Sequence, residues 1–332
     1  MGTGASVPNN IIRRDSYKGR CQREPWGRMR PSPIKKGGDF MADLKLFLFG
    51  FPRLERDGKA VEINRRKSMA LAAYLAVTRK PQSREALATL CWPDLDQKLA
   101  QASLRTTLWY MNKIFGPEWL TIGRDHIELH QHKSDWIDVN RFQECLAQSA
   151  DHRHPEDRFC QVCLISLSQA VEIYQDEFLA GFSLPDNDAF EEWKRSQAQR
   201  LNRNLIKALE RLIHMHIDRQ EYEQALAYAF QLVKADSLNE SAHGYLMKLY
   251  AWLGQPTSAL KQYEECSRIL AKELDVKPQE SMANLYLAIK EKRFPVLQNQ
   301  NGQGSFLSEK NKSLMSLPRI PPISAERELL VA

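Results

Sequence analysis

Two groups of side chains in this sequence have residue types and spacings that could perform chemistry. The first is His152-x-His154, which is followed by Cys160-x-x-Cys163. Two imidazoles and two thiolates can complete a tetrahedral zinc site, and a Cys-x-x-Cys pair is a common half of one. Four protein ligands leave no open position for catalysis, so this zinc ion would be structural and would hold the start of a helix expected from Ala170. The alternative is a solvated loop with chance histidines and two small buried cysteines.

The second group lies on the stretch from Asp96 to Gly116. Apolar residues recur there at helical spacing and form one stripe: Leu104, Leu108, Met111 and Phe115. The other face has no acidic side chain and offers amide, hydroxyl, aromatic and guanidinium groups: Gln101, Arg105, Thr106, Trp109, Tyr110, Asn112 and Lys113. Such groups can hydrogen-bond base edges and phosphates. Trp109 stands at the edge of the stripe, where a large aromatic is more often core than contact.

The residues predicted to contact DNA fall into three sets. On the helix 98–115, the predicted contacts to the groove and its adjacent phosphates are Arg105, Thr106, Tyr110 and Lys113. At the starts of two earlier helices, the free N–H groups and the helix dipole favour phosphate. The residues at those starts are Arg65, Arg66, Ser83 and Arg84. A third contact is Arg124, whose position in a predicted hairpin turn would let it enter the minor groove.

The elements around this helix give a recognisable order. Alternating residues predict a small antiparallel sheet over Leu44–Gly50, Pro52–Glu55 and Ala60–Ile63, with a tight turn at Asp57-Gly58. Two helices follow, one over Arg65–Thr78 with Asn64 as its N-cap, and one that Ser83 caps and that runs through Leu90. After the helix 98–115, Trp119–Leu129 predicts a hairpin around Gly123-Arg124-Asp125. This is the order of a winged helix-turn-helix.

Residues 44–140 resemble the OmpR/PhoB-type winged helix, in the variant found at the N-terminus of SARP/AfsR-like bacterial transcriptional activators. The segments that carry the resemblance are RRKSMALAAYLAVTRKPQSREALATLCWPDLD and ASLRTTLWYMNKIFG. They match the first helix, second helix, loop and recognition helix of that family in order. One difference is that the family often has extra arginines late in the recognition helix, where this chain has Asn112 and Lys113.

After Val139 the sequence predicts amphipathic helices only. They are expected over 170–182, 190–217, 222–234, 240–253, 257–270 and 280–290. Tyr222, Ala225 and Leu226 recur as Pro256, Ala259 and Leu260, at the 34-residue period of tetratricopeptide (TPR) repeats. The region from about Phe142 to Lys290 also resembles the bacterial transcriptional activation domain that follows the winged helix in SARP-type proteins.

The predicted fold is therefore an α+β winged helix-turn-helix domain followed by an all-α, TPR-like helical solenoid. Residues 1–43 are expected to be a disordered leader, or to lie upstream of a true translation start at Met41. The winged helix is expected over 44–140 and the activation domain over 141–293. Residues 294–332 are expected to be a linker or tail, and their end is similar to the lead-in to the ATPase of longer family members.

Composition and charge exclude several classes of protein. The net charge of +6 comes from residues 1–40, which carry nine Lys or Arg and three Asp or Glu, so the remainder is neutral. A DNA site must therefore be a local patch. No apolar run is long enough to span a membrane, there is no signal peptide, and six cysteines without framework spacing fit a reducing compartment. We expect a cytoplasmic protein without a membrane partner.

Nothing in the sequence predicts catalysis. No nucleophile, base and orienting group can be assembled from spacing, and the acidic pairs fall on solvated helix faces. His214 and His216 are two residues apart on a helix and should point in different directions. We expect a protein that is not an enzyme and that requires no cofactor, apart from the structural zinc considered above.

The sequence predicts a sequence-specific transcriptional regulator, an activator by resemblance, that binds double-stranded DNA with the helix 98–115. The helical domain would contact a second copy of the chain, as in a homodimer, or RNA polymerase. The alternative is a TPR-type scaffold or signalling adaptor whose winged helix is a protein-interaction module. The local basic residues at helix starts favour the first interpretation, and the neutral body keeps the second open.

Overall fold

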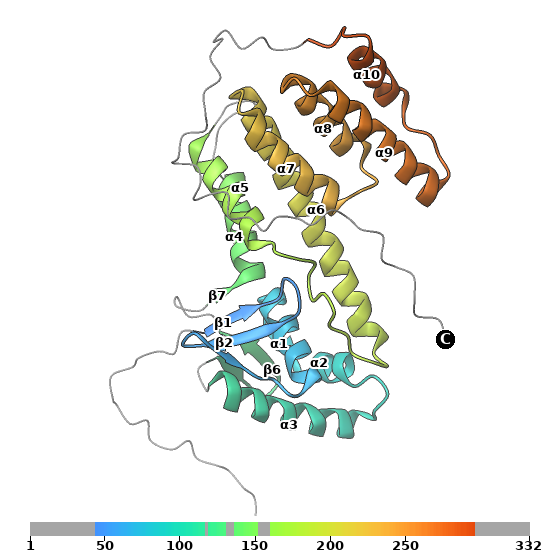
Figure 1. Cartoon of the computed structure of the whole chain (residues 1–332). Coiled ribbons are helices and arrows are strands. Elements are labelled where there is room, and N and C mark those ends of the chain that lie inside the picture. Colours follow the sequence, from blue (N-terminus) through green and yellow to red (C-terminus); the bar gives the residue numbers. More distant parts are fainter. Residues whose placement is uncertain (1–43, 117–118, 131–135, 152–159, 296–332) are drawn as a thin grey trace, which may run out of the picture. The chain divides into compact units, whose positions relative to one another are not determined.

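The computed structural model of the chain describes residues 44–116, 119–130, 136–151 and 160–295 (Figure 1). The predicted leader and most of the predicted tail lie outside these residues. The first part contains three helices and two small sheets, and the second contains helices only. No helix among the described residues is both long enough and apolar enough to cross a membrane.

The first sheet has four strands in the order β3-β2-β1-β7. The strands are β1 (Leu44–Phe47), β2 (Arg53–Arg56), β3 (Lys59–Val61) and β7 (Trp136–Ile137). The three consecutive strands are antiparallel, and Asp57 and Gly58 both have positive φ at the turn, as a tight hairpin requires. The sequence did not predict β7, which pairs parallel to β1 and depends on a long-range contact.

Three helices and a second sheet complete the winged helix-turn-helix order. They are α1 (Arg66–Thr78), β4 (Gln82–Ser83), α2 (Arg84–Cys91), α3 (Gln97–Phe115), β5 (Leu120–Ile122) and β6 (His126–Leu129). The strands β5 and β6 form the predicted hairpin, and β4 adds to its edge. The N-cap of α1 is Arg65 and not Asn64, because Ser68 N already donates to Arg65 O.

The second part consists of seven helices among the described residues. They are α4 (Asp138–Asp151), α5 (Gln161–Ile173), α6 (Asp188–Asp218), α7 (Tyr222–Ala235), α8 (Glu240–Trp252), α9 (Pro256–Leu274) and α10 (Glu280–Lys290). Consecutive helices from α6 to α10 pack on one another (Figure 1). This stacking of helices is what the sequence pattern predicted, while the TPR-like detail stays a prediction.

The predicted helix over 170–182 is wrong in both of its bounds. The helix α5 begins at Gln161 and ends at Ile173, and the chain after it pairs with the end of β1. Leu179 N donates to Leu48 O at 2.8 Å, and Gly50 N donates to Glu177 O at 2.9 Å. Phe178 and Leu179 are buried in this arrangement. Long-range burial and backbone pairing therefore override the local helical pattern.

A buried carboxylate joins β1 to α4. Asp138, the first residue of α4, is 2% exposed, and its Oδ2 accepts hydrogen bonds from Leu48 N at 2.7 Å and Phe49 N at 2.8 Å. Its Oδ1 accepts one from Val139 N at 2.7 Å. Burial raises the pKa of Asp138 to about 6, and the three N–H groups offset part of that rise.

The hydrophobic core runs through the winged helix and on to α8. One cluster of buried residues includes Leu46 of β1, Leu108 of α3 and Leu246 of α8. Asn187 strengthens this connection, because its Nδ2 donates to Leu90 O of α2 at 2.8 Å while its Oδ1 caps α6. A smaller cluster joins α8, α9 and α10. Contacts thus cross the predicted boundary at residue 140.

Candidate nucleic-acid interface

The helix α3 has one buried face and one exposed face, as its sequence pattern predicts. Asp96 caps it, since Oδ1 accepts from Lys98 N at 2.9 Å and from Leu99 N at 3.1 Å. The predicted apolar stripe is buried throughout: Leu104, Leu108, Met111 and Phe115. No residue from Gln97 to Phe115 is acidic. The core therefore fixes which side chains α3 presents outward.

Three of the predicted DNA contacts lie on the outward face of α3. Arg105, Thr106 and Lys113 are all exposed. The Thr106 hydroxyl donates to Ala102 O at 3.2 Å, and the Lys113 ammonium lies 5.8 Å from the centre of the Trp109 ring. Neither Arg105 nor Lys113 makes an ion pair within the described part of the chain. These cations therefore remain available to an anion from outside.

Tyr110, the fourth predicted contact on α3, also holds two elements together. Its hydroxyl accepts a hydrogen bond from Asn64 N at 3.3 Å, and the Arg65 guanidinium lies 4.6 Å from the centre of its ring. The half-buried tyrosine thus connects α3 to the residues that precede α1. An arginine held over an aromatic face is oriented by a cation–π contact. Arg65 is consequently positioned beside α3.

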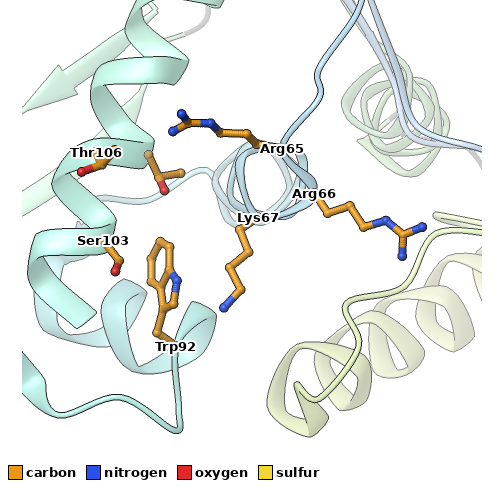
Figure 2. Close-up of a pocket in the computed structure, with 7 residues that line it drawn as sticks. Arg65, Arg66, Lys67, Trp92, Ser103 and Thr106 are labelled. Atoms are coloured by element: carbon orange, nitrogen blue, oxygen red, sulfur yellow. The ribbon is translucent and has the colours of Figure 1, made fainter. Parts of the chain in front are cut away.

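A shallow pocket of about 410 Å³ lies between the start of α1 and α3 (Figure 2). The residues that line it are Arg65, Arg66, Lys67, Trp92, Ser103, Thr106 and Thr107. Figure 2 shows Arg65 directed toward α3 and Arg66 directed to the opposite side of α1. Lys67 extends toward Trp92, with its ammonium 5.0 Å from the ring centre. Two cations, Arg65 and Lys67, and three hydroxyl-bearing residues therefore line a space that suits a phosphate.

Lys67 and Ser103 were not among the residues predicted from the sequence. Lys67 is the third basic residue in the run at the start of α1, and that run was the available signal. Ser103 precedes Thr106 by three residues, so the two hydroxyls lie on one side of the helix.

Ser83 and Arg84 lie where α2 meets the hairpin. Ser83 caps α2 as predicted, because its Oγ accepts from Ala86 N at 3.0 Å. Arg84 is half-buried, and it donates from its backbone N to Asp125 O at 3.0 Å and from Nε to Gly123 O at 3.1 Å. These two carbonyls flank Arg124 in the turn. Arg84 therefore braces the turn, and the exposed Arg124 makes no ion pair with any residue of the described ranges.

The sequence leaves Trp109 open between a core position and an outward contact, and the structure decides between them. The Trp109 side chain is not part of the core but is 64% exposed on the outward face of α3. At 100° per residue Trp109 lies on the side of α3 away from the buried stripe, so the helical spacing is a better guide to its exposure than its residue type.

The predicted zinc ligands are only partly within the described residues. His152 and His154 lie outside them. Cys160 is the N-cap of α5 and Cys163 lies buried in its first turn, so the pair begins a helix and does not lie in a loop before one. The N–H of Cys163 lowers the pKa of the Cys160 thiol, and burial raises the pKa of Cys163, whose Sγ donates to Ser149 O at 3.6 Å. The zinc site stays a prediction, which the zinc content of the purified protein would test.

The two histidines on α6 have different partners, as expected from their spacing. His214 Nε2 pairs with the Tyr245 hydroxyl at 2.8 Å, and His216 Nδ1 pairs with Glu221 Oε2 at 2.7 Å. Within the described ranges, no three His, Cys, Asp or Glu side chains gather in a way that could hold a metal ion.

Known proteins resemble this chain in both of its parts. Residues 137–290 match the family described as the bacterial transcriptional activator domain. The regulatory protein AfsR of Streptomyces coelicolor is 24% identical over 243 residues, which are 73% of this chain. The match spans only 24% of the length of AfsR.

A solved structure shows the same fold. Mycobacterium tuberculosis EmbR, in complex with a low-affinity phosphopeptide, superposes with a TM-score of 0.58 at 20% identity. The superposition covers 77% of this chain and 66% of EmbR. The predicted resemblance is therefore confirmed: residues 137–290 match the bacterial transcriptional activator domain, and the chain is similar to a regulatory protein of the SARP/AfsR type.

Proposed function

We propose that this regulator binds double-stranded DNA in a sequence-specific way and that α3 enters the major groove. The observation that carries the proposal is the outward face of α3, on which Lys98, Arg105 and Lys113 are exposed and no acidic residue is present. Groups that hydrogen-bond bases and phosphates stand between these cations. This composition is more typical of a helix that binds a polyanion than of a helix that only faces solvent.

The flanking elements would hold the DNA backbone. Arg65 and Lys67 line the pocket between α1 and α3, where a phosphate beside the groove would meet two cations. Arg124 projects from the turn that Arg84 braces. From this position in the wing, Arg124 would contact a second phosphate or enter the minor groove. In this proposal α3 supplies base contacts, and the start of α1 and the turn supply orientation.

The helical part would make protein contacts. We propose that α6–α10, a TPR-like stack, meets a second copy of the chain or RNA polymerase and so activates transcription. Stacked helical repeats commonly bind partners along the surface that the stack creates. The two partners predict different DNA sites. Contact with a second copy of the chain would favour a repeated DNA site, and contact with polymerase would not require a repeat.

Selection of bound DNA from a random pool tests this proposal. The full chain should enrich a defined site, and the spacing of any repeat would identify a second copy. A triple variant, Arg65→Ala with Arg105→Ala and Lys113→Ala, should enrich nothing while it retains its melting temperature, because all three side chains are exposed. An unenriched pool with the wild-type chain would contradict DNA binding and favour the protein-scaffold alternative.

A further inference from the structure

Trp109 occupies the middle of the outward face of α3. At 100° per residue, Trp109, Ala102 and Lys113 lie opposite the buried stripe of the helix. Arg105 precedes Trp109 by one turn and Lys113 follows it by one turn, and the Lys113 ammonium is 5.8 Å from the centre of the indole ring. Trp109 is 64% exposed. Any surface that α3 meets must therefore meet this indole.

An indole in the major groove has few partners that suit it. The base edges there present hydrogen-bond donors and acceptors, and the exception is the C5-methyl group of thymine. The indole has a single donor, its Nε1–H, so the rest of the ring placed against polar edges would remove their water without replacing the hydrogen bonds, which costs free energy. The indole cannot stack on a base face, because the bases of an intact duplex already stack on one another. A thymine methyl is thus the contact that the exposed ring favours.

We propose that Trp109 determines specificity by packing its indole against a thymine methyl group, an inference that rests on the proposed DNA binding by α3. The helix rises about 6 Å from Arg105 to Trp109, and successive base pairs are about 3.4 Å apart. The thymine should therefore lie about two base pairs from the base that Arg105 contacts. Guanine is the base that suits Arg105, because its edge offers two acceptors to a guanidinium.

Removal of one methyl group tests the contact. Each thymine of the selected site is replaced singly by deoxyuridine, which lacks the C5-methyl and keeps the hydrogen-bonding groups. The wild-type full chain should lose affinity about three- to five-fold at one position, as expected when about 0.8 kcal/mol of buried methyl is removed. The Trp109→Ala variant should bind the site more weakly and should show no further loss with deoxyuridine at that position.

Two controls separate this contact from other effects. Phe51 is 66% exposed on the loop after β1, so Phe51→Ala is a matched loss of an exposed aromatic and should leave DNA affinity and the deoxyuridine effect unchanged. The melting temperature of Trp109→Ala should equal that of the wild type, because the indole is outside the core.

The outcomes distinguish the inference from the function on which it rests. If a site is selected but contains no thymine near the Arg105 position, or if deoxyuridine weakens wild type and Trp109→Ala equally, the methyl contact is wrong and DNA binding stands. A Trp109→Ala variant that binds every sequence less tightly by one factor would also overturn it, since that result indicates contact with the DNA backbone. If no site is selected at all, the proposed function fails and this inference fails with it.

Discussion

The helices α3 and α9 are each 19 residues long but differ in how they use their exposed charges. On α9, Arg268 pairs with Glu265 at 2.6 Å and Lys272 lies 3.0 Å from Glu273. Arg268 and Lys272 therefore have acidic partners on the same helix. On α3, no acidic residue follows the cap, and its lysines and arginine make no ion pair with a described residue.

This difference separates a solvated helix from a candidate binding helix. Charges of both signs on α9 form ion pairs with one another and are solvated by water, which is the usual state of a surface helix. The uniform charge of α3 costs some self-repulsion, and no ion pair with a described residue offsets it. A partner with regularly spaced negative charges would offset that cost, so the contrast with α9 favours DNA as the ligand of α3.

The largest effect is expected from the buried face of α3. Leu108 is 2% exposed, so Leu108→Ala should lower the free energy of unfolding by about 2–5 kcal/mol through a cavity. DNA binding should fall together with the melting temperature. Leu270 of α9 is equally buried but belongs to the smaller core cluster. Leu270→Ala should lower stability and leave DNA affinity intact. If both Leu108→Ala and Leu270→Ala lose stability and DNA affinity together, the distinction between the two helices is not supported.

The next effect concerns Asp138, where the part that contains α3 joins the part that contains α9. Asp138→Asn replaces one acceptor oxygen by a donor that faces a backbone N–H group, and this should cost about 1–3 kcal/mol of stability in a denaturant titration. The folded pKa of about 6 is above the ordinary value of 3.8, so the folded state binds the proton more tightly.

This shift sets the direction of the pH dependence. As the pH falls from 7 to 4, wild type should gain stability relative to Asp138→Asn, and as the pH rises through 6 the gain should be lost. A difference between the two proteins that does not change over this range would indicate that the three N–H groups fully offset burial.

Arg105 tests the exposed face of α3 alone. A guanidinium paired with a guanine edge contributes about 1–3 kcal/mol of discrimination, so Arg105→Ala should weaken the selected site by about five-fold or more and flatten the preference at one base pair. The melting temperature should not change, because Arg105 is exposed. Arg268→Ala on α9 is the matched control and should leave DNA affinity unchanged in a fluorescence anisotropy titration.

The smallest effect is expected from Lys113, near the end of α3. If its ammonium meets a phosphate, Lys113→Ala should weaken selected and random DNA by the same factor. The slope of log affinity against log salt should fall by about one, since each neutralised phosphate releases about one counterion. Lys272→Ala on α9 should leave the slope unchanged. An unchanged slope for Lys113→Ala would place this lysine off the DNA.

The sequence predicts α3 well because its determinants are local. Asp96 caps the helix through its own side chain, and the apolar spacing of Leu104 and Leu108 fixes the buried face. The hairpin after α3 is equally local, since it depends on the residues of one turn. These features require no knowledge of distant parts of the chain.

The errors occur where distant segments decide the structure. The segment that contains Phe178 and Leu179 has a helical pattern, yet it pairs with the end of β1 far away in the sequence. The contact of the Arg84 guanidinium with a carbonyl in the hairpin turn is also long-range, while the predicted DNA contact of Arg84 stays a prediction.

The most direct test of the account asks which helix touches DNA. A photo-crosslinking amino acid is placed either at Thr106 of α3 or at Lys261 of α9, both of which are exposed, and each chain is irradiated with labelled selected DNA. We expect a covalent DNA adduct from position 106 and none from position 261. An adduct from position 261, or the lack of one from position 106 in a chain that still binds the DNA, would contradict the assignment of α3 as the DNA-binding helix.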